Sequence, residues 1–148
     1  MTGPRSRIDA SLIVSLVGLA ISAYLTIEHF TSPTVLACPE GAVINCAKVT
    51  SSQWSMILGI PVAVLGLGYF VVMTALLTPA AWRRPTLTPV RIAGVIAGVG
   101  MALYLIWVEL FRVNAICLWC TAVHVCTVVL FATVLWRTTQ RDSAPDMG

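Results

Sequence analysis

Two cysteines separated by two residues form the stretch of this chain whose chemistry is easiest to name. The motif Cys117-Leu118-Trp119-Cys120 stands at the start of the last apolar segment. A Cys-x-x-Cys pair can cycle between a dithiol and a disulfide, and the N-terminus of a helix favours the thiolate of the first cysteine. We therefore predict redox chemistry for this pair. A structural metal site and a purely structural disulfide are the alternatives.

A second pair, Cys38 and Cys46, lies in residues 31–56, which form the one sizeable polar loop. The two pairs together could supply four zinc ligands, but the gap between Cys38 and Cys46 is long for a zinc site. A static disulfide that closes the loop is one interpretation. The other is a shuttle, because a loop containing Pro39 and Gly41 can carry a thiol between an outside partner and Cys117. Thiol–disulfide exchange requires such movement, since a thiolate must attack a sulfur directly.

His124 shares a helix face with both cysteines of the motif, because it follows Cys120 by four residues and Cys117 by seven. An ionisable group inside an apolar segment is a candidate functional residue. His124 could therefore donate a hydrogen bond or a proton to a ligand beside Cys120, or it could simply bond to a neighbouring helix. Cys126 is rotated by roughly 120° from Cys120 on a helix, and we expect an ordinary buried thiol there.

The elements that must position these residues are membrane-spanning helices. Of the 148 residues, 58% are hydrophobic and only 10% are charged, whereas soluble domains have roughly 25% charged residues. The net charge of +3 does not suggest nucleic acid as a partner. Apolar runs at residues 8–30, 61–77, 92–111 and 116–136 are long enough to cross a bilayer. We expect an all-α membrane protein, a four-transmembrane-helix bundle that forms one domain over residues 1–148, with a disordered tail at 137–148.

The first apolar run has an alternative interpretation as a cleaved signal peptide or a lipoprotein signal ending at Cys38. Glu28, His29 and the turn at residues 31–34 argue against it. They separate the apolar run from Cys38, whereas the apolar core of a signal normally extends to its cleavage site.

The loop between the first and second runs is expected to contain a short helix in the membrane interface. Residues 50–53, Thr-Ser-Ser-Gln, have the pattern of a capping box that opens a helix. Pro61 would end or kink that helix, which predicts helix over 51–60 with Trp54 as an interfacial anchor. Ser51 and Ser52 would then cap the helix, or one of them could donate a hydrogen bond to a bound carbonyl. Further along, Glu109 and Arg112 have the spacing of an ion pair and are expected to anchor the interface.

The basic residues predict the orientation. An even number of spans puts both termini and the 79–91 loop on one side of the membrane. That side collects seven of the nine basic residues, namely Arg5, Arg7, Arg83, Arg84, Arg91, Arg137 and Arg141. The positive-inside rule places this side in the cytoplasm. Both termini are therefore expected to be cytoplasmic, and the four paired cysteines to lie on the extracytoplasmic side of the cell inner (plasma) membrane.

The electrons from the thiols need an acceptor, and the sequence has no haem, flavin or nucleotide motif. A disulfide-forming membrane protein without its own cofactor site can use an oxidant dissolved in the lipid. A quinone, such as menaquinone or ubiquinone, fits this requirement, and we expect no metal. The apolar interior of a four-helix bundle beside Cys120 could receive the quinone ring.

Several motifs together resemble those of the vitamin K epoxide reductase family in its bacterial form. They are residues 24–29, Cys38-x7-Cys46, Ser51-Ser52-Gln53-Trp54, Gly59-Ile60-Pro61 and the Cys117–Cys120 motif, and the resemblance covers about residues 10–136. The unrelated quinone reductases of the DsbB type also have four helices but lack the serine–tryptophan segment. We expect no fused thioredoxin-like domain, so the partner should be a separate protein.

The resemblance implies a membrane thiol:quinone oxidoreductase for oxidative protein folding. It would pass disulfides to a separate thioredoxin-like (DsbA-like) partner outside the membrane. Cys38 would exchange with the partner, Cys46 would form a transient disulfide with Cys117, and Cys120 would react with the quinone. A quinone-epoxide reductase using the same residues is one alternative. A non-catalytic membrane protein braced by disulfides is the other.

Ser52 matches the family serine near the quinone, and we count Trp54, Val62 and His124 with it as quinone-contacting positions. Two of these depart from the family pattern. His124 stands where the animal enzymes have a tyrosine, and Val62 stands where many members have an asparagine after Gly-Ile-Pro. Val62 removes a donor to a quinone carbonyl, and His124 is the residue expected to compensate.

Overall fold

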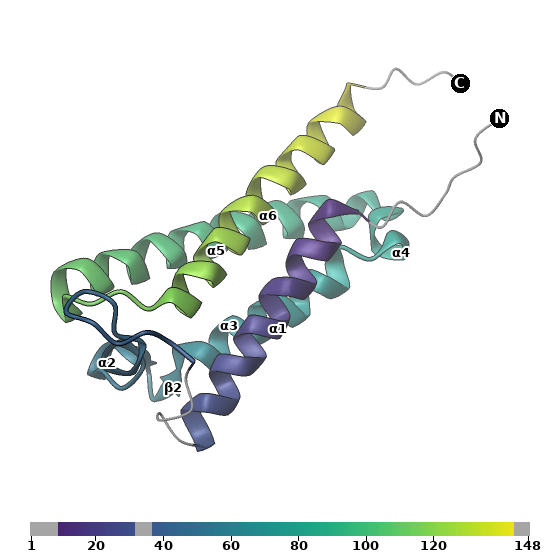
Figure 1. Ribbon diagram of the computed structural model, residues 1–148. Helices are drawn as coiled ribbons and strands as arrows, with labels where there is room; N and C mark the ends of the chain where they lie inside the picture. The colour runs from purple at the N-terminus through teal and green to yellow at the C-terminus, as the bar shows by residue number, and fades with distance from the viewer. Residues whose placement is uncertain (1–8, 32–36, 144–148) are drawn as a thin grey trace, which may run out of the picture.

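The computed structural model describes residues 9–31 and 37–143. Four long helices dominate it (Figure 1): α1 (Ala10–Thr31), α3 (Val62–Leu76), α5 (Thr88–Val108) and α6 (Leu118–Asp142). The start of α1 and the end of α6 lie at one end of the bundle, beside the short helix α4 (Pro79–Trp82). The loop after α1 lies at the other end, beside the start of α6. All four paired cysteines therefore belong to one end.

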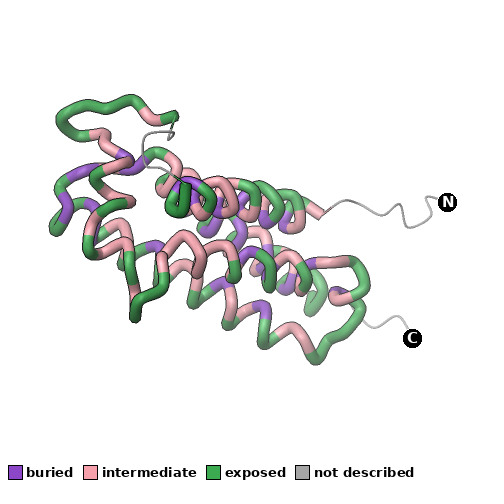
Figure 2. The backbone as a smooth tube through the Cα atoms, turned by 90° about the horizontal axis from the view of Figure 1, so that it is seen from below, coloured by how far each residue is buried: buried purple, intermediate pink, exposed green. Residues whose placement is uncertain are grey.

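Small and apolar residues allow the helices to approach closely. Helix α1 packs against α3 and α6, and α5 packs against α6. Gly18 of α1 leaves room for the ring of Phe70, and Gly94 of α5 leaves room for Met73. The apolar core forms where these helices meet, from Phe70, Met73, Leu77, Trp82, Val95, Leu130 and Val134. Many large apolar side chains on the outer faces are exposed (Figure 2), as expected of helices that face lipid.

Within the described residues, three helical segments are long and apolar enough to cross a membrane: α1, residues Pro85–Val113, and α6. The second of these is almost continuous. It begins with the 3₁₀ turn η2 (Pro85–Leu87), continues through α5, and ends in the π-helical turn η3 (Glu109–Val113). Helix α3 occupies the position of the expected second span but has only 15 residues. Its role as a fourth span stays a prediction.

The end of the bundle away from the cysteines is more ordered than the sequence suggested. We expected disorder from residue 137, but α6 continues to Asp142. Arg141 donates a hydrogen bond of 2.6 Å to the carbonyl of Trp82, and Arg137 pairs with Asp9. Three guanidinium groups lie over the Trp82 ring, including that of the fully buried Arg91. These contacts extend the last helix by about one and a half turns. Residues 144–148 lie outside the described residues.

The expected interfacial helix over 51–60 is wrong. The loop instead forms α2 (Cys46–Thr50), the 3₁₀ turn η1 (Gln53–Ser55), and an antiparallel pair of two-residue strands, β1 (Met56–Ile57) and β2 (Ile60–Pro61). Leu58 and Gly59 connect the strands with φ angles of 52° and 80°, which is left-handed backbone that a helix cannot contain.

The capping-box interpretation of Ser51 and Ser52 is wrong as well, because both side chains serve the end of α2. The hydroxyl of Ser51 donates to the carbonyl of Ala47 at 2.7 Å, and that of Ser52 donates to the carbonyl of Val49 at 2.8 Å. The short helix begins instead at Asn45, whose side chain accepts a hydrogen bond from the N–H of Lys48. This is the usual role of an asparagine N-cap.

Candidate functional site

A short parallel pairing fixes the position of the loop cysteines relative to the Cys-x-x-Cys motif. Ile44 and Ile116 form a parallel β-bridge. The N–H of Asn45 donates to the carbonyl of Ile116 at 3.0 Å, and the N–H of Ile116 donates to the carbonyl of Val43 at 2.9 Å. Because the pairing is parallel, the residues that follow it on both segments, including Cys46 and Cys117, emerge side by side.

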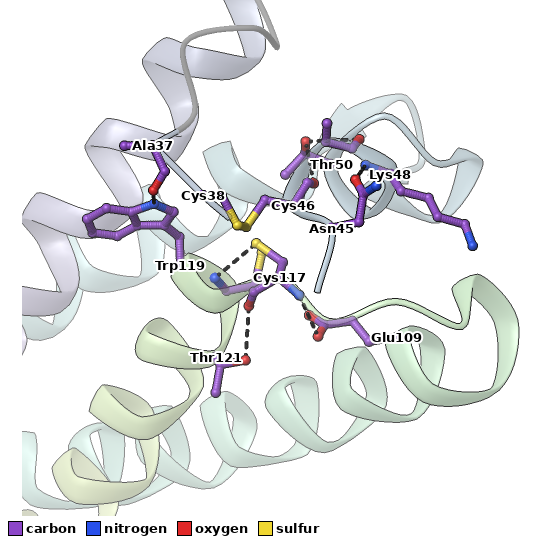
Figure 3. Close-up of a disulfide and its surroundings, with 12 residues drawn as sticks. Ala37, Cys38, Asn45, Cys46, Lys48, Thr50, Glu109, Cys117, Trp119 and Thr121 are labelled. Atoms are coloured by element: carbon purple, nitrogen blue, oxygen red, sulfur yellow. Dashed lines mark hydrogen bonds between the residues drawn. A yellow bond between two sulfur atoms is a disulfide. The ribbon is translucent and has the colours of Figure 1, made fainter. Parts of the chain in front are cut away.

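The four paired cysteines occupy two redox states in this structure. Cys38 and Cys46 form a disulfide, whereas Cys117 and Cys120 are free thiols. Figure 3 shows the Cys117 sulfur beside this disulfide and pointing toward it. Cys46 and Cys117 are both 0% exposed, and Cys38 is only partly buried. An outside thiol can therefore reach Cys38 more easily than the two inner sulfurs.

Cys117 caps the N-terminus of α6. Its sulfur accepts a hydrogen bond of 3.2 Å from the backbone N–H of Cys120. The hydrogen bond from the Cys120 thiol lowers the pKa of the Cys117 thiol below its usual value, and the backbone N–H of Cys120 adds to this effect. Burial and the nearby Glu109 carboxyl oppose it without cancelling it. Cys117 is therefore the thiol of the motif that more readily becomes an attacking thiolate.

A pH titration checks this assignment. In the fully reduced protein, the alkylation rate of Cys117 should reach its plateau at a lower pH than that of an ordinary cysteine, because its folded-state pKa is lowered. The variant Cys120→Ala removes the main stabilising donor and should move the midpoint to higher pH. Peptide mass spectrometry of alkylated Cys117 provides the measurement, with Cys126→Ala as the control. An unchanged midpoint in Cys120→Ala would contradict the proposed cause.

A contact between Trp119 and Ala37 holds the Cys38 segment against α6. The indole N–H of Trp119 donates to the carbonyl of Ala37 at 3.2 Å (Figure 3). The N–H of Ala37 in turn donates to the hydroxyl of Tyr24 at 3.3 Å, and the rings of Tyr24 and Trp119 are 5.0 Å apart. The middle residue of the motif thus helps to position the loop disulfide over the thiol pair.

A cavity of about 310 Å³ opens beside Cys120 between the helices. Its lining contains the four positions that the sequence analysis assigned to quinone contact: Ser52, Trp54, Val62 and His124. The structure thus brings residues from the loop, α3 and α6 together around Cys120. Cys38, Cys46 and Cys117 do not line it, which separates the exchange site from the cavity. The roles of the individual residues stay predictions.

The hydroxyl groups that line the cavity at the cysteine end of the bundle already donate hydrogen bonds to backbone carbonyls. Ser52 donates to Val49 as described, Thr50 donates to the carbonyl of Cys46 at 3.0 Å, and Ser55 donates to the carbonyl of Ser52 at 2.7 Å. Ser52 therefore presents only its lone pairs to the cavity, and donation to a quinone carbonyl would require this bond to break. His124 is buried and makes no hydrogen bond to another residue within the described ranges.

Glu109 has a different position from the one expected. It is only 6% exposed, it lines the cavity, and its carboxylate accepts a hydrogen bond of 3.4 Å from the backbone N–H of Cys117. Arg112 lies over the rings of Trp54 and Trp107 instead, and within the described ranges the two residues form no ion pair. From the sequence, an acidic residue near the end of an apolar run is expected to anchor the interface. The sequence does not show that η3 directs the Glu109 side chain inward.

Sequence reasoning also missed Ser22 and Tyr69, which lie deeper in the same cavity. A single hydroxyl residue within an apolar helix matches no sequence motif. These two are identified as candidates only because their hydroxyl oxygens are buried without a hydrogen-bond partner among the described residues. As to metals, the described part of the chain contains no group of three or more His, Cys, Asp or Glu side chains arranged to hold an ion.

Apolar helices that carry a thiol pair beside a disulfide at one end define a class of membrane thiol–disulfide proteins. The model of the vitamin K epoxide reductase family matches residues 10–135, which is most of the chain. The chain belongs to this family, as its motifs predicted. The family is one of oxidoreductases that use quinone, and its membership together with the apolar helices indicates a membrane protein.

Proposed function

We propose that this protein oxidises thiols outside the cytoplasm and passes their electrons to a quinone in the bilayer. The observation that carries the proposal is the placement of the two thiols of the motif. Cys117 faces the loop disulfide, whereas Cys120 lines an apolar cavity between the helices. The thiol that exchanges with the loop disulfide and the thiol that faces the cavity are thus separated by about one helical turn.

The path consists of balanced thiol–disulfide exchanges. The quinone accepts two electrons and two protons from the dithiol Cys117/Cys120, which becomes a disulfide while the quinone becomes a quinol. The Cys46 thiolate then attacks the Cys117 sulfur and releases Cys120, and the Cys38 thiolate attacks Cys46 and releases Cys117. The resulting state has an oxidised loop pair and a reduced motif, which is the state of this structure. A thiolate of the partner finally attacks Cys38 and releases Cys46. The second thiol of the partner then attacks the partner's own sulfur in this mixed disulfide and releases Cys38, so the partner leaves with the disulfide.

The proposed orientation places the cysteine end outside and the arginine end in the cytoplasm, with α3 as the fourth span. Arg83, Arg84, Arg91, Arg137 and Arg141 lie in α4, in the turns around it or in the helix ends beside it, which supports this orientation. The partner is a separate thioredoxin-like protein, because such domains present the thiol pairs that can reach the accessible Cys38.

Quinone reduction by the purified protein tests the proposal. The assay supplies a reduced thioredoxin-like protein as electron donor and 2-methyl-1,4-naphthoquinone as acceptor, and follows the loss of donor thiols together with the absorbance of the quinone. Two thiols of the donor should be oxidised for each quinone that is reduced. If the thiols persist and the loop disulfide stays unchanged, the protein is not a thiol oxidase and its disulfide is structural. Turnover only with the quinone epoxide would favour the epoxide reductase instead.

His124 provides a specific prediction. The substitution His124→Phe should raise the KM for quinone about 3- to 10-fold, because it removes one neutral hydrogen bond to the ligand. Exchange between the loop disulfide and the partner should keep its rate, since His124 lines the cavity and neither Cys38 nor Cys46 does. Steady-state quinone kinetics and a single-turnover exchange assay measure the two steps separately. A KM equal to that of the unsubstituted protein would show that His124 only packs in the bundle and does not bind the quinone.

A further inference from the structure

Two hydroxyl groups deep in the cavity have no hydrogen-bond partner in the part of the chain that the structure describes. The Ser22 side chain is 1% exposed, and the oxygens of both Ser22 and Tyr69 are buried without a partner among the described residues. Buried hydroxyl groups are normally hydrogen-bonded, and an unbonded one in a native structure indicates a bound water, a ligand or another function. Both residues line the cavity that contains Cys120. Their donors are therefore available to whatever occupies this cavity.

The other hydroxyl groups in the lining differ in this respect. Those of Thr50, Ser52 and Ser55 donate to backbone carbonyls at the cysteine end of the bundle. Thr127, which lies at the depth of Tyr69, donates to the carbonyl of Val123 at 2.9 Å. Among the described residues, the hydroxyl groups of Ser22 and Tyr69 thus differ from those of the other lining residues in having no hydrogen-bond acceptor, and not only in where they lie.

The two free hydroxyls lie at a common depth. Ser22 precedes His29 by seven residues on α1, and Tyr69 follows Val62 by seven residues on α3. Seven residues of helix correspond to about 10 Å. Because α1 and α3 run in opposite directions, the step from His29 back to Ser22 and the step from Val62 on to Tyr69 both go away from the cysteine end. The cavity therefore has one polar end at Cys120 and His124, and a second polar end at Ser22 and Tyr69.

A glycine on a facing helix leaves space for the Tyr69 hydroxyl, and a second glycine lies opposite Ser22 at ordinary contact distance. The hydroxyl of Tyr69 lies over Gly98 of α5, where any side chain would collide with it. The hydroxyl of Ser22 would lie 3.4 Å from a Cβ atom at Gly66 of α3. The helix contacts thus accommodate the two hydroxyls without supplying an acceptor for either.

We propose that Ser22 and Tyr69 bind the quinone oxygen that is farthest from Cys120. This inference rests on the proposed function and states how a para-quinone, whose two oxygens project from opposite sides of the ring, would be held at both ends. One oxygen lies near Cys120 and His124, and the other accepts hydrogen bonds from the deep hydroxyls. An ortho-quinone carries both oxygens on one side and can engage only one of the two polar ends. The deep donors also supply a ligand contact that Val62 does not.

Substitution of the deep hydroxyls tests the assignment. In Tyr69→Phe and Ser22→Ala, the Kd of 2-methyl-1,4-naphthoquinone should rise about 3- to 10-fold for each lost hydrogen bond. The KM should rise in parallel, while kcat changes little because neither residue touches Cys120. The preference for this quinone over 1,2-naphthoquinone should fall in both variants. Tryptophan fluorescence quenching gives the Kd, since Trp54 lines the cavity.

Matched controls separate binding from folding. Tyr104→Phe removes a tyrosine hydroxyl on α5 outside the cavity, and Ser15→Ala removes a buried serine hydroxyl on α1 that is bonded to Thr74; neither should change quinone affinity. The thermal midpoint of Tyr69→Phe and Ser22→Ala should not fall, because neither hydroxyl has a protein partner to lose. A structural role would instead lower the midpoint without changing the para-to-ortho preference.

The outcomes also distinguish this inference from the proposed function. If the unsubstituted protein reduces quinone and both deep variants keep its Kd and its para-to-ortho preference, the deep subsite is wrong and the proposed function stands. If the unsubstituted protein neither binds nor reduces the quinone, both are wrong. A selective loss of para-quinone affinity at full thermal stability supports the subsite.

Discussion

Replacing Cys120 by alanine is expected to reduce quinone reduction to the uncatalysed background. Cys120 is the only one of the four paired cysteines that lines the cavity, so its loss removes the sulfur that can contact a bound quinone. The Cys117 thiolate can still attack Cys46 and release Cys38, but Cys120 is missing to attack Cys117, so only the released Cys38 can resolve the Cys46–Cys117 disulfide. This mixed disulfide should therefore accumulate when the released Cys38 is alkylated. Peptide mapping without reduction detects it.

The control for this variant is Cys126→Ala, which removes the remaining cysteine of α6. Cys126 packs against the apolar core, and its substitution should leave quinone reduction unchanged. Recovery of only the Cys38–Cys46 disulfide from Cys120→Ala, under conditions that alkylate free thiols, would contradict the relay. Undiminished quinone reduction in Cys120→Ala would remove Cys120 from the mechanism altogether.

The second large effect is expected from Glu109→Gln. Oxidation of the dithiol releases two protons inside a largely apolar site, and Glu109 is the buried carboxylate that lies at both the Cys117 backbone and the cavity. If it accepts one of these protons, the amide should lower kcat about 10²- to 10⁴-fold, which is the usual contribution of a positioned acid or base. Glutamine preserves the shape and can still accept the hydrogen bond from Cys117.

The pH profile provides the decisive readout for Glu109. The unsubstituted protein should lose activity as the carboxylate is protonated at low pH, whereas Glu109→Gln should lack this acidic limb. The exposed Glu40 allows a matched control, because Glu40→Gln changes the same charge far from the proton transfer. Equal kcat values and the same acidic limb in Glu109→Gln would show that this carboxylate only positions the Cys117 backbone.

The sequence predicts the long helices well, because each apolar run has a composition that only a helix can satisfy in lipid. The predicted runs 61–77 and 116–136 begin within a few residues of α3 and α6. The loop at 51–60 could not be predicted in the same way. Its capping pattern is local, but its conformation depends on hydrogen bonds back to α2 and on the left-handed turn at Leu58 and Gly59.

The candidate site was accessible to sequence reasoning only where a motif or a helix spacing pointed to it. The spacing of Cys120 and His124 predicts a shared face, and both line the cavity. Glu109 and Tyr69 acquire their positions from the π-helical turn η3 and from the contact with Gly98. Such tertiary features leave no periodic signal in a single sequence, so residues of this kind are found only in three dimensions.

The parallel bridge between Ile44 and Ile116 has a consequence for biosynthesis. The loop cysteines are made early, but the backbone that aligns them with their reaction partner belongs to the last third of the chain. During translation the first helix and its loop therefore exist for some time without an exchange partner. In the proposed mechanism, the electron path would become continuous only when the final helix has entered the bundle, so an incomplete chain would not divert electrons from thiols to the quinone pool.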